Sequence, residues 1–423
     1  MKPYRMVESG IMPADSPGTP PVATGPLAGI RVLELGNFVA APTAGRLLAE
    51  FGAEVIKIEL PSVGDEVRGW RLARGDTSMM WRAIARNKKS VTIDLRTPEG
   101  AELVRRLVQH VDVVVENYRP GKLESWGLSP ETLREHNPGL IVVRISGYGQ
   151  TGPYRDRAGF GSVAESMGGI RYVTGYEDRP PTRMNISIGD TLAGMYGVIG
   201  ALMGLLARER GLASRGETVD VALTEAVFSV MESMVPDYSA YGLVRQRTGN
   251  LISGVAPSGT YPCRDGGWIV IGGNSDGIFK RFMHAIGRSD LAEDPRLRDN
   301  PGRAANGLEL NEAISDWTRT QTVEEAMEVM TGAHVPAGPI YSVAELVDDP
   351  HFRARGMFLE RDVRIEDGEE PIIFPGVVPK LEQMPGKMRW PGPELGEHTA
   401  EVLTGILGLT ETELSELAER RVV

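Results

Sequence analysis

The chain has 423 residues, of which 41% are hydrophobic and 24% are charged, a composition typical of a globular protein long enough for two domains. Its formal net charge of −11 argues against nucleic acid as a partner. A single cysteine, Cys263, excludes an internal disulfide and fits a reducing, cytoplasmic location. The longest apolar run, residues 193–207, is shorter than a membrane span of about 20 residues, so no membrane association is expected.

The first part of the chain alternates between strand and helix patterns. Residues 1–26 are rich in Pro, Gly, Ser and Thr, and they predict a disordered or loosely draped arm. After the arm, apolar runs and amphipathic segments predict strands over 29–35, 54–60, 90–95, 112–117 and 140–146, with helices over 42–51, 98–110 and 129–136. This alternation predicts a Rossmann-like, doubly wound parallel sheet of the α/β class. Ligands of such sheets bind beyond the carboxyl ends of the strands.

The later part of the chain changes in character. A long helix is expected over 191–210, followed by a strand and helix within 217–234. A hairpin closed by Asp265-Gly266-Gly267 and helices near 279–287 and 308–320 predict a second, α+β domain. The expected division is therefore a large domain over 27–225, a linker over 226–245, a small domain over 246–335, and a return crossing with the C-terminal part of the large domain over 336–423.

One segment of this acidic chain is strongly basic. Between Arg68 and Lys89 there are seven basic residues and one acid, Asp76, a local balance of +6. A cationic surface of this kind suits a small polyanion such as a nucleotide or coenzyme A. The alternative is a solvated face whose charges bind nothing specific.

Several common catalytic motifs are missing. The first strand–helix turn, LGNFVAAPTAG, lacks the G-x-G-x-x-G spacing, which disfavours a nicotinamide or flavin dehydrogenase. There is no P-loop and no serine elbow at a strand–helix turn. The six histidines are scattered, and no His/Cys cluster has metal-ligand spacing, so no metal site is expected.

Asp190 is the candidate nucleophile that remains. It stands before the long apolar helix, at or next to its N-cap, where the helix dipole favours a carboxylate. Gly189 is expected to let the backbone turn sharply and a bulky ligand approach. Asp190 can therefore act as a simple helix cap or as a nucleophile.

At this point the chain resembles the class III coenzyme A transferases, a family that includes formyl-CoA, carnitine and succinyl-CoA-dependent dicarboxylate transferases. The resemblance extends from about residue 26 to the C-terminus. It is carried, in order, by PLAGIRVLELGNFVAAPTAG, GAEVIKIELPSVGDEVRGW, ARNKKSVTIDLRTPEG, DVVVENYRPGKLESWGL, RISGYGQTGPYRDRAGF, IGDTLAGMYGVIGAL and VPAGPIYSVAEL.

The resemblance implies an interlocked homodimer, no tightly bound cofactor, and transfer of coenzyme A from an acyl-CoA to a small carboxylic acid, with succinyl-CoA as the expected donor and a dicarboxylic acid as a candidate acceptor. It assigns Asp190 as the nucleophile, which passes through aspartyl anhydride and aspartyl-CoA thioester intermediates. The family pattern departs here at two expected arginines, which are Leu60 and Ser125. The implied CoA contacts, including substitutes for those arginines, are Val39, Ala40, Ile93, Asp94, Leu95, Arg96, Asn117, Tyr118, Arg119, Lys122, Ser146, Gly147 and Tyr148.

Two alternatives stay open at the level of sequence. An α-methylacyl-CoA racemase-like epimerase shares the fold and the aspartate, but it needs a second acid/base group where this chain has Phe160-Gly161. The second alternative is a protein that binds coenzyme A but catalyses no reaction. For a dicarboxylic substrate, Arg155, Arg157 and Arg183 are candidates to bind the distal carboxylate or to form structural ion pairs. The Ser253-Gly254 loop is expected to close over Asp190.

Overall fold

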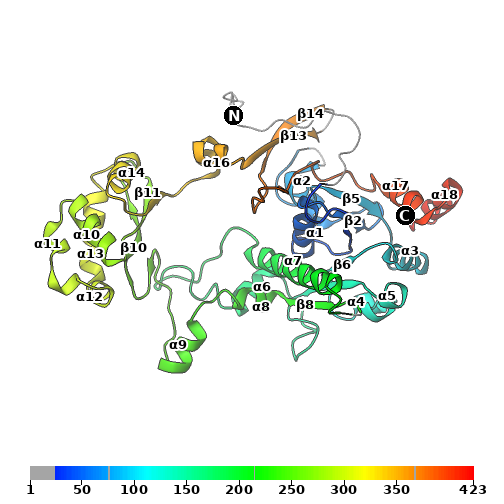
Figure 1. Ribbon diagram of the computed structural model, residues 1–423, viewed down its shortest axis with the longest axis horizontal. Coiled ribbons are helices and arrows are strands. Elements are labelled where there is room, and N and C mark those ends of the chain that lie inside the picture. Colours follow the sequence, from blue (N-terminus) through cyan, green and yellow to red (C-terminus); the bar gives the residue numbers. More distant parts are fainter. Residues whose placement is uncertain (1–23, 75–76, 214, 366–367) are drawn as a thin grey trace. The chain divides into compact units, whose positions relative to one another are not determined.

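The computed structural model describes residues 24–74, 77–213, 215–365 and 368–423, so nearly all of the predicted N-terminal arm lies outside the described residues. The chain divides into two compact units (Figure 1). The first combines Met1–Ile170, Met184–Met231 and Pro350–Val423, and the second combines Arg171–Arg183 with Glu232–Asp349. The second unit thus begins earlier and ends later than the predicted small domain, and the predicted linker contains helix α9 (Met234–Tyr241).

A six-stranded sheet, parallel throughout, forms the centre of the first unit. Counted along the chain, its strands lie in the order 3-2-1-4-5-6, which is the order of Rossmann-type doubly wound sheets, so the predicted fold class is confirmed. The order reverses between β1 and β6, where a ligand crevice is expected at the carboxyl edge. In spatial order the strands are β5 (Lys88–Thr92), β2 (Glu54–Glu59), β1 (Arg31–Glu34), β6 (Val113–Glu116), β7 (Ile141–Ser146) and β8 (Thr218–Ala222).

Helices cover both faces of this sheet, as buried parallel strands require. Successive strand residues point to opposite faces, so Val32 packs with the helices on one side and Leu33 with those on the other. The first face carries α1 (Ala40–Glu50), α7 (Ile188–Glu209) and α8 (Leu223–Phe228), and the second carries α3 (Pro98–Val108), α5 (Pro130–His136) and α17 (Thr399–Leu407).

Shorter elements complete the first unit. The C-terminal part of the chain returns to it and adds a hairpin, so the first unit draws on both ends of the sequence (Figure 1). These elements are β3 (Ala73–Arg74), β4 (Thr77–Ser78), α2 (Met79–Ile84), α4 (Lys122–Ser125), α6 (Gly161–Met167), α16 (Pro350–Ala354), β13 (Phe358–Ile365), β14 (Gly368–Pro375) and α18 (Glu411–Glu419).

Helix α7 packs unusually close to its neighbours because its buried face is rich in glycine. A Cβ atom on Gly200 would lie 2.3 Å from Cγ1 of Val219, and one on Gly194 would lie 2.7 Å from the Ala40 carbonyl oxygen. The helix is longer than the predicted apolar run, and by length and mean hydropathy of 1.4 it is the one described helix that could cross a membrane. A core helix of a soluble protein passes the same test, and here one face of α7 packs on the sheet and α1.

The second unit is built from an antiparallel sheet with helices packed beside it, which is the predicted α+β arrangement. The hairpin turn forms as expected: the Cys263 amide donates to the Gly267 carbonyl, and Gly266 has φ +82°. Besides α9, its elements include β9 (Leu251–Ile252), β10 (Val255–Pro262), β11 (Trp268–Gly272), α10 (Asp276–Ala285), α11 (Ser289–Ala292), α12 (Asn300–Ala305), α13 (Gly307–Thr318), α14 (Val323–Gly332), β12 (Ala337–Pro339) and α15 (Val343–Asp348).

Candidate active site

Asp190 is the third residue of α7, inside its first turn rather than at the N-cap, which is Ser187. Its carboxylate lies directly against the backbone of Gly161, the first residue of α6. A Cβ atom on Gly161 would lie 2.1 Å from Oδ2 and 2.6 Å from Cγ of Asp190. A side chain at position 161 would therefore force this carboxylate to move, and the positive end of the α7 dipole favours a negative charge at its position.

Gly189 has a different role from the expected one. It is buried within α7, and a Cβ there would lie 3.1 Å from the Gly161 carbonyl oxygen and 3.3 Å from Cγ of Glu165. Gly189 thus allows α7 to approach α6 and does not open space for a ligand. The two glycines together bring the first turns of α6 and α7 into contact.

The turn between β1 and α1 is held by side chains from the segments that follow β2 and β6. The Asn37 amide donates to Asn117 Oδ1 at 2.8 Å, and Asn117 Nδ2 donates to the Asn37 carbonyl at 2.7 Å. The hydroxyl of Tyr118 donates to the Leu35 carbonyl at 2.6 Å. Phe38, which has φ +66°, donates its amide to Asp65 Oδ1 at 3.1 Å. Because these protein groups bind the turn, its backbone is not arranged to bind a pyrophosphate.

A buried cluster of charges lies beneath this turn, and the sequence analysis did not identify it. Lys57 Nζ pairs with Asp65 at 2.9 Å and Glu34 at 3.3 Å, and it donates to the Gly36 carbonyl at 2.6 Å. Lys88 pairs with Glu34 at 2.7 Å, and burial lowers its pKa to about 8. The sequence does contain a signal for this cluster, which is a lysine in the middle of the apolar strand EVIKIE. A lysine buried in a strand requires oppositely charged partners nearby.

A second buried network supports Asn117 and Tyr118. Glu116 accepts the Tyr118 amide at 2.7 Å and pairs with Arg144 at 2.7 Å. Burial raises the pKa of Glu116 to about 7, against the opposing charge of Arg144. The Tyr118 ring packs edge-on against Trp126 at 5.0 Å, so the side chain of Tyr118 contributes to packing of the loop.

The other predicted contact residues lie on or just beyond the carboxyl ends of the strands. Ile93 and Leu95 are buried in the core, while Arg96 is exposed and pairs with Asp94 at 2.7 Å. Ser146 Oγ accepts the Gly149 amide at 3.0 Å. Of the remaining residues, Val39 and Ala40 are buried at the start of α1, Gly147 packs on Gly159, Tyr148 packs edge-on against Tyr154, and Arg119 and Lys122 are exposed after β6.

The basic segment forms neither of the two surfaces that the sequence left open, a polyanion-binding surface or a solvated face. All but one of its seven basic residues form ion pairs with other parts of the fold, and three of them, Arg82, Arg86 and Lys88, are buried. Arg71 is the exception, since it enters no ion pair among the described residues. The pairs are Arg68 with Glu59, Arg74 with Glu370, Arg82 with Glu394, Arg86 with Glu50, Lys88 with Glu34, and Lys89 with Glu54 and Glu401.

The chemistry that this site can perform rests on a carboxylate. Within the described parts of the chain there is no group of three or more His, Cys, Asp or Glu side chains that could hold a metal ion. Cys263 is buried in the second unit, where burial raises the pKa of its thiol and disfavours a thiolate nucleophile. A carboxylate such as Asp190, in the first turn of a helix, can act as a nucleophile towards an activated acyl group.

The chain matches CoA-transferase family III over residues 27–399, and it belongs to this family. It is a CoA-transferase. It is 51% identical over 399 residues to succinyl-CoA–D-citramalate CoA-transferase of Chloroflexus aurantiacus, covering 94% of this chain and 98% of that protein. It is 43% identical to the beta subunit of succinyl-CoA–L-malate CoA-transferase from the same organism, with 94% and 98% covered. A CaiB/BaiF family protein from Brucella suis shares its structure, with a TM-score of 0.79, 34% identity, and 90% and 100% covered.

The contact between Gly161 and Asp190 predicts a large effect of a single methyl group. In a Gly161→Ala variant the carboxylate must move by about 1 Å, which is expected to lower kcat about a hundredfold. The KM for the CoA thioester should change little, because the strand ends are untouched. Steady-state kinetics checks this, with Ser162→Ala on the same helix as the control. Full activity of the Gly161→Ala variant would show that the contact does not position Asp190.

Glu116 predicts a pH dependence of stability. Because its pKa is raised from 4.5 to about 7 in the folded state, its contribution is fully present below pH 4.5 and is lost as the pH rises through 7. The difference in unfolding free energy between wild type and Glu116→Gln should therefore fall by about 3 kcal/mol between pH 4.5 and 8. Chemical denaturation across this range measures it, with Glu102→Gln as an exposed control. A difference that stays constant with pH would contradict the assignment.

Proposed function

We propose that this chain transfers coenzyme A from succinyl-CoA to a small dicarboxylic acid, with Asp190 as the nucleophile. The placement of Asp190 in the first turn of α7, against Gly161, is the observation that carries the proposal. The names of the two Chloroflexus relatives, which act with succinyl-CoA on citramalate and malate, support the substrate class. The epimerase alternative is disfavoured because a glycine, and not a second acid or base, lies opposite the aspartate.

The reaction exchanges one thioester for another. An oxygen of Asp190 attacks the thioester carbonyl, the C–S bond breaks, and CoA thiolate leaves a mixed anhydride. The thiolate then attacks the aspartyl carbonyl, which releases the donor acid with one oxygen from Asp190 and forms an aspartyl-CoA thioester. The acceptor carboxylate displaces the thiolate from that thioester, and the thiolate attacks the acceptor carbonyl, which restores Asp190. The scheme needs neither ATP nor a tightly bound cofactor.

The helix terminus supports each step electrostatically. The first amides of α7 lack acceptors within the helix, and the dipole places partial positive charge beside the aspartate. Each tetrahedral intermediate carries an oxyanion next to these amides. Donors placed where charge develops lower the barrier without reorganising.

We assign the coenzyme to the carboxyl edge of the sheet, along the predicted contacts. Leu60 and Ser125 cannot bind phosphate through a positive charge, and Ser125 Oγ instead donates to the Lys122 carbonyl at 2.7 Å. Three exposed cations at this edge, Arg96, Arg119 and Lys122, are suited to replace them. Of these, Arg119 enters no ion pair among the described residues, whereas Arg96 is held by Asp94.

We assign the carboxylic acid substrate to a cavity that is lined by residues close to Asp190 in the sequence. A cavity of about 300 Å³ is lined by Ser187 and Thr191, which flank the aspartate, and by Val39. Arg71 also lines it, together with Arg46 and Arg86, which share Glu50 at 2.9 and 2.5 Å. Arg71 is thus a positive charge suited to a distal carboxylate.

The arginines predicted for that role are less suited. Arg155 pairs with Asp156 at 3.4 Å, and the Arg157 guanidinium stacks on the Tyr154 ring at 3.6 Å. Arg183 and the Gly254 loop belong to the second unit, so their roles stay predictions. Gly254 has φ +74° and no heavy atom within 4 Å of an added Cβ, and its carbonyl accepts Asn300 Nδ2 at 2.7 Å.

We also propose that the chain forms a homodimer. The outer face of α7 exposes a run of large apolar side chains, and burying such a face is favourable. The family resemblance implies that a second copy of the chain covers this face. The exposed residues are Met195, Tyr196, Ile199, Leu202, Met203 and Leu206.

We further propose that the enzyme is cytoplasmic and acts without membrane or nucleic acid. Its one cysteine is buried and unpaired, and its net charge is −11. These properties fit a reducing compartment and repel nucleic acid. Cell fractionation tests the location, and enzyme found with the membrane fraction would contradict it.

The covalent step is tested by trapping. After incubation with succinyl-CoA, mass spectrometry should find a CoA adduct on the peptide that contains Asp190, and hydroxylamine should convert it to a hydroxamate at that residue. An Asp190→Ala variant should bind CoA with unchanged affinity and transfer none. An adduct at another residue, or turnover by the alanine variant, would remove Asp190 as the nucleophile.

The acid pocket is tested by a pair of arginine variants. Loss of one charge-assisted contact, worth about 1.5–3 kcal/mol, should raise the KM for a dicarboxylic acceptor about tenfold to a hundredfold in Arg71→Gln. A monocarboxylic acceptor of equal length should be little affected. Arg155→Gln should resemble wild type. The assignment is contradicted if Arg155→Gln raises the KM for the dicarboxylic acceptor and Arg71→Gln does not. It is also contradicted if Arg71→Gln raises the KM for both acceptors equally.

The dimer is tested by placing a charge on the exposed face of α7. Light scattering coupled to size-exclusion chromatography should report twice the mass of the chain for wild type, and a smaller or aggregated species for Met203→Asp. Glu416→Lys, on exposed α18, is the control. A wild-type monomer in solution would overturn the proposal.

A further inference from the structure

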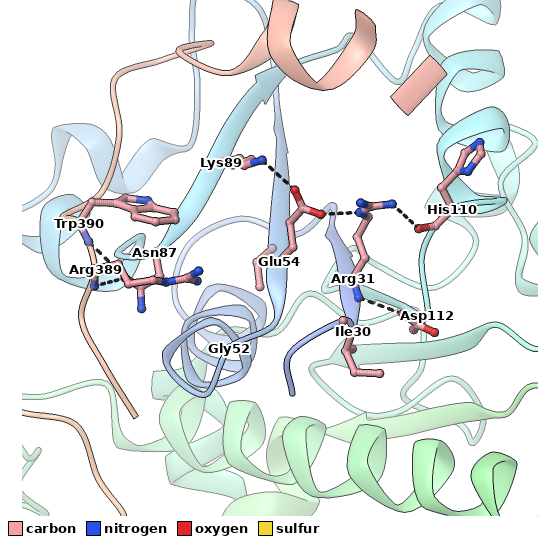
Figure 2. Close-up of a pocket in the computed structure, with 12 residues that line it drawn as sticks. Ile30, Arg31, Gly52, Glu54, Asn87, Lys89, His110, Asp112, Arg389 and Trp390 are labelled. Atoms are coloured by element: carbon pink, nitrogen blue, oxygen red, sulfur yellow. Dashed lines mark hydrogen bonds and ion pairs between the residues drawn. The ribbon is translucent and has the colours of Figure 1, made fainter. Parts of the chain in front are cut away.

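A cavity of about 330 Å³, whose lining residues are drawn in Figure 2, lies at the amino edge of the sheet, whereas Asp190 lies at the carboxyl edge. It is formed at the amino ends of four parallel strands, where β1 begins at Arg31, β2 at Glu54, β5 beside Lys89, and β6 after Asp112. We call it the amino-edge pocket. The remaining lining residues are Gly29, Ile30, Gly52, Val55, Asn87, His110, Arg389 and Trp390.

The two carboxylates that line the amino-edge pocket are already bound on both oxygens. Glu54 accepts Arg31 at 2.6 Å on one oxygen and Lys89 at 2.7 Å on the other, and it lies between them in Figure 2. Asp112 accepts the Arg31 amide at 2.9 Å and Arg208 at 2.6 Å. Neither carboxylate is available as a counter-charge for a further cation.

Arg389 is that further cation. Its guanidinium lies over the Trp390 ring at 4.5 Å, and its one hydrogen bond among the described residues is a long one, at 3.4 Å, to the Ala49 carbonyl. It enters no ion pair in the described parts of the chain. Burial lowers the pKa of Arg389, and the charge of Glu54 opposes this shift, so the side chain stays cationic at neutral pH.

The segment that carries Arg389 is held firmly in place. Asn87 Oδ1 accepts the Arg389 amide at 2.6 Å, and Asn87 Nδ2 donates to the Lys387 carbonyl at 2.7 Å. Trp390 Nε1 donates to the Lys88 carbonyl at 3.0 Å. The guanidinium is thus preorganised at the cavity wall, across from Glu54 and its two partners (Figure 2).

We propose that the amino-edge pocket binds a small oxyanion, a carboxylate or a phosphate, through the guanidinium of Arg389. Three cations and two saturated carboxylates line the pocket, which leaves a net positive charge for an anion. The guanidinium fork matches two oxygens of such a group. The volume is at the low end for ligand sites, which suits a small acid.

Binding at this pocket should be visible as stabilisation. An anion would link the C-terminal segment at Arg389 to the first strands of the sheet, and a ligand that binds only the folded state raises its stability. The site is separate from Asp190, which lies at the other end of the strands. It does not rest on the proposed substrate, and an Asp190→Ala variant should keep it intact.

The experiment is isothermal titration calorimetry of the full chain carrying Asp190→Ala, with sodium phosphate and sodium succinate as separate probes at constant ionic strength. We expect saturable binding of at least one probe, and at least about tenfold weaker binding after Arg389→Gln. Arg389→Lys should bind with intermediate affinity, because it keeps the charge and loses the fork. Arg319→Gln, an exposed arginine of the second unit, should bind as the parent does.

Binding of phosphate alone would identify a phosphate-binding site, and binding of succinate alone would identify a carboxylate-binding site. Tryptophan fluorescence locates the event, since the signal on titration should disappear in Trp390→Phe while the heat remains. No saturable heat with either probe overturns the proposal. Unchanged affinity in a folded Arg389→Gln variant, checked by circular dichroism, overturns it as well.

Discussion

The close approach of helix α7 to the sheet and to α6 is the constraint on which the active site depends. Glycines at the buried positions of α7 let its backbone lie where a side chain would collide with Val219 or with the Ala40 carbonyl. This packing fixes the first turn of the helix, and Gly161 then fixes the carboxylate of Asp190 against the start of α6. Asp190, the nucleophile that we propose, is thus positioned by glycines where side chains would collide with it, and the dipole of the helix that carries it favours a negative charge there.

The strand order of this protein is that of dinucleotide-binding domains, yet its first turn is arranged differently. Side chains from β2 and from the loop after β6 occupy the carbonyls and amides of the turn, among them Lys57 and Asn117. A dinucleotide whose pyrophosphate lies on this turn would have to compete with these buried bonds, whereas coenzyme A in the position that we propose, along the strand ends, leaves them intact. The fold therefore serves a thioester substrate without the glycine-rich motif.

Local patterns predicted much of this arrangement. The alternation of apolar strands with amphipathic helices predicted the parallel sheet. The position of Asp190 before a long apolar helix made it the candidate nucleophile. What could not be predicted depends on pairs far apart in the sequence. The basic segment looked like a surface because its partners, such as Glu370 and Glu394, lie about three hundred residues later in the chain. The sequence suggested that Gly189 leaves space for a ligand. In the structure α6 fills that space, and the sequence around Gly189 does not indicate that α6 packs there.

The central claim is that oxygen passes through Asp190 during transfer, and isotope labelling tests it most directly. With an acceptor acid labelled with ¹⁸O in its carboxylates, turnover should leave one ¹⁸O atom in the Asp190 side chain, and later turnovers should carry label into released succinate. Mass spectrometry of the peptide and of the product acid measures both. Label that passes only to the acyl-CoA product, with none in Asp190 or succinate, would contradict the account.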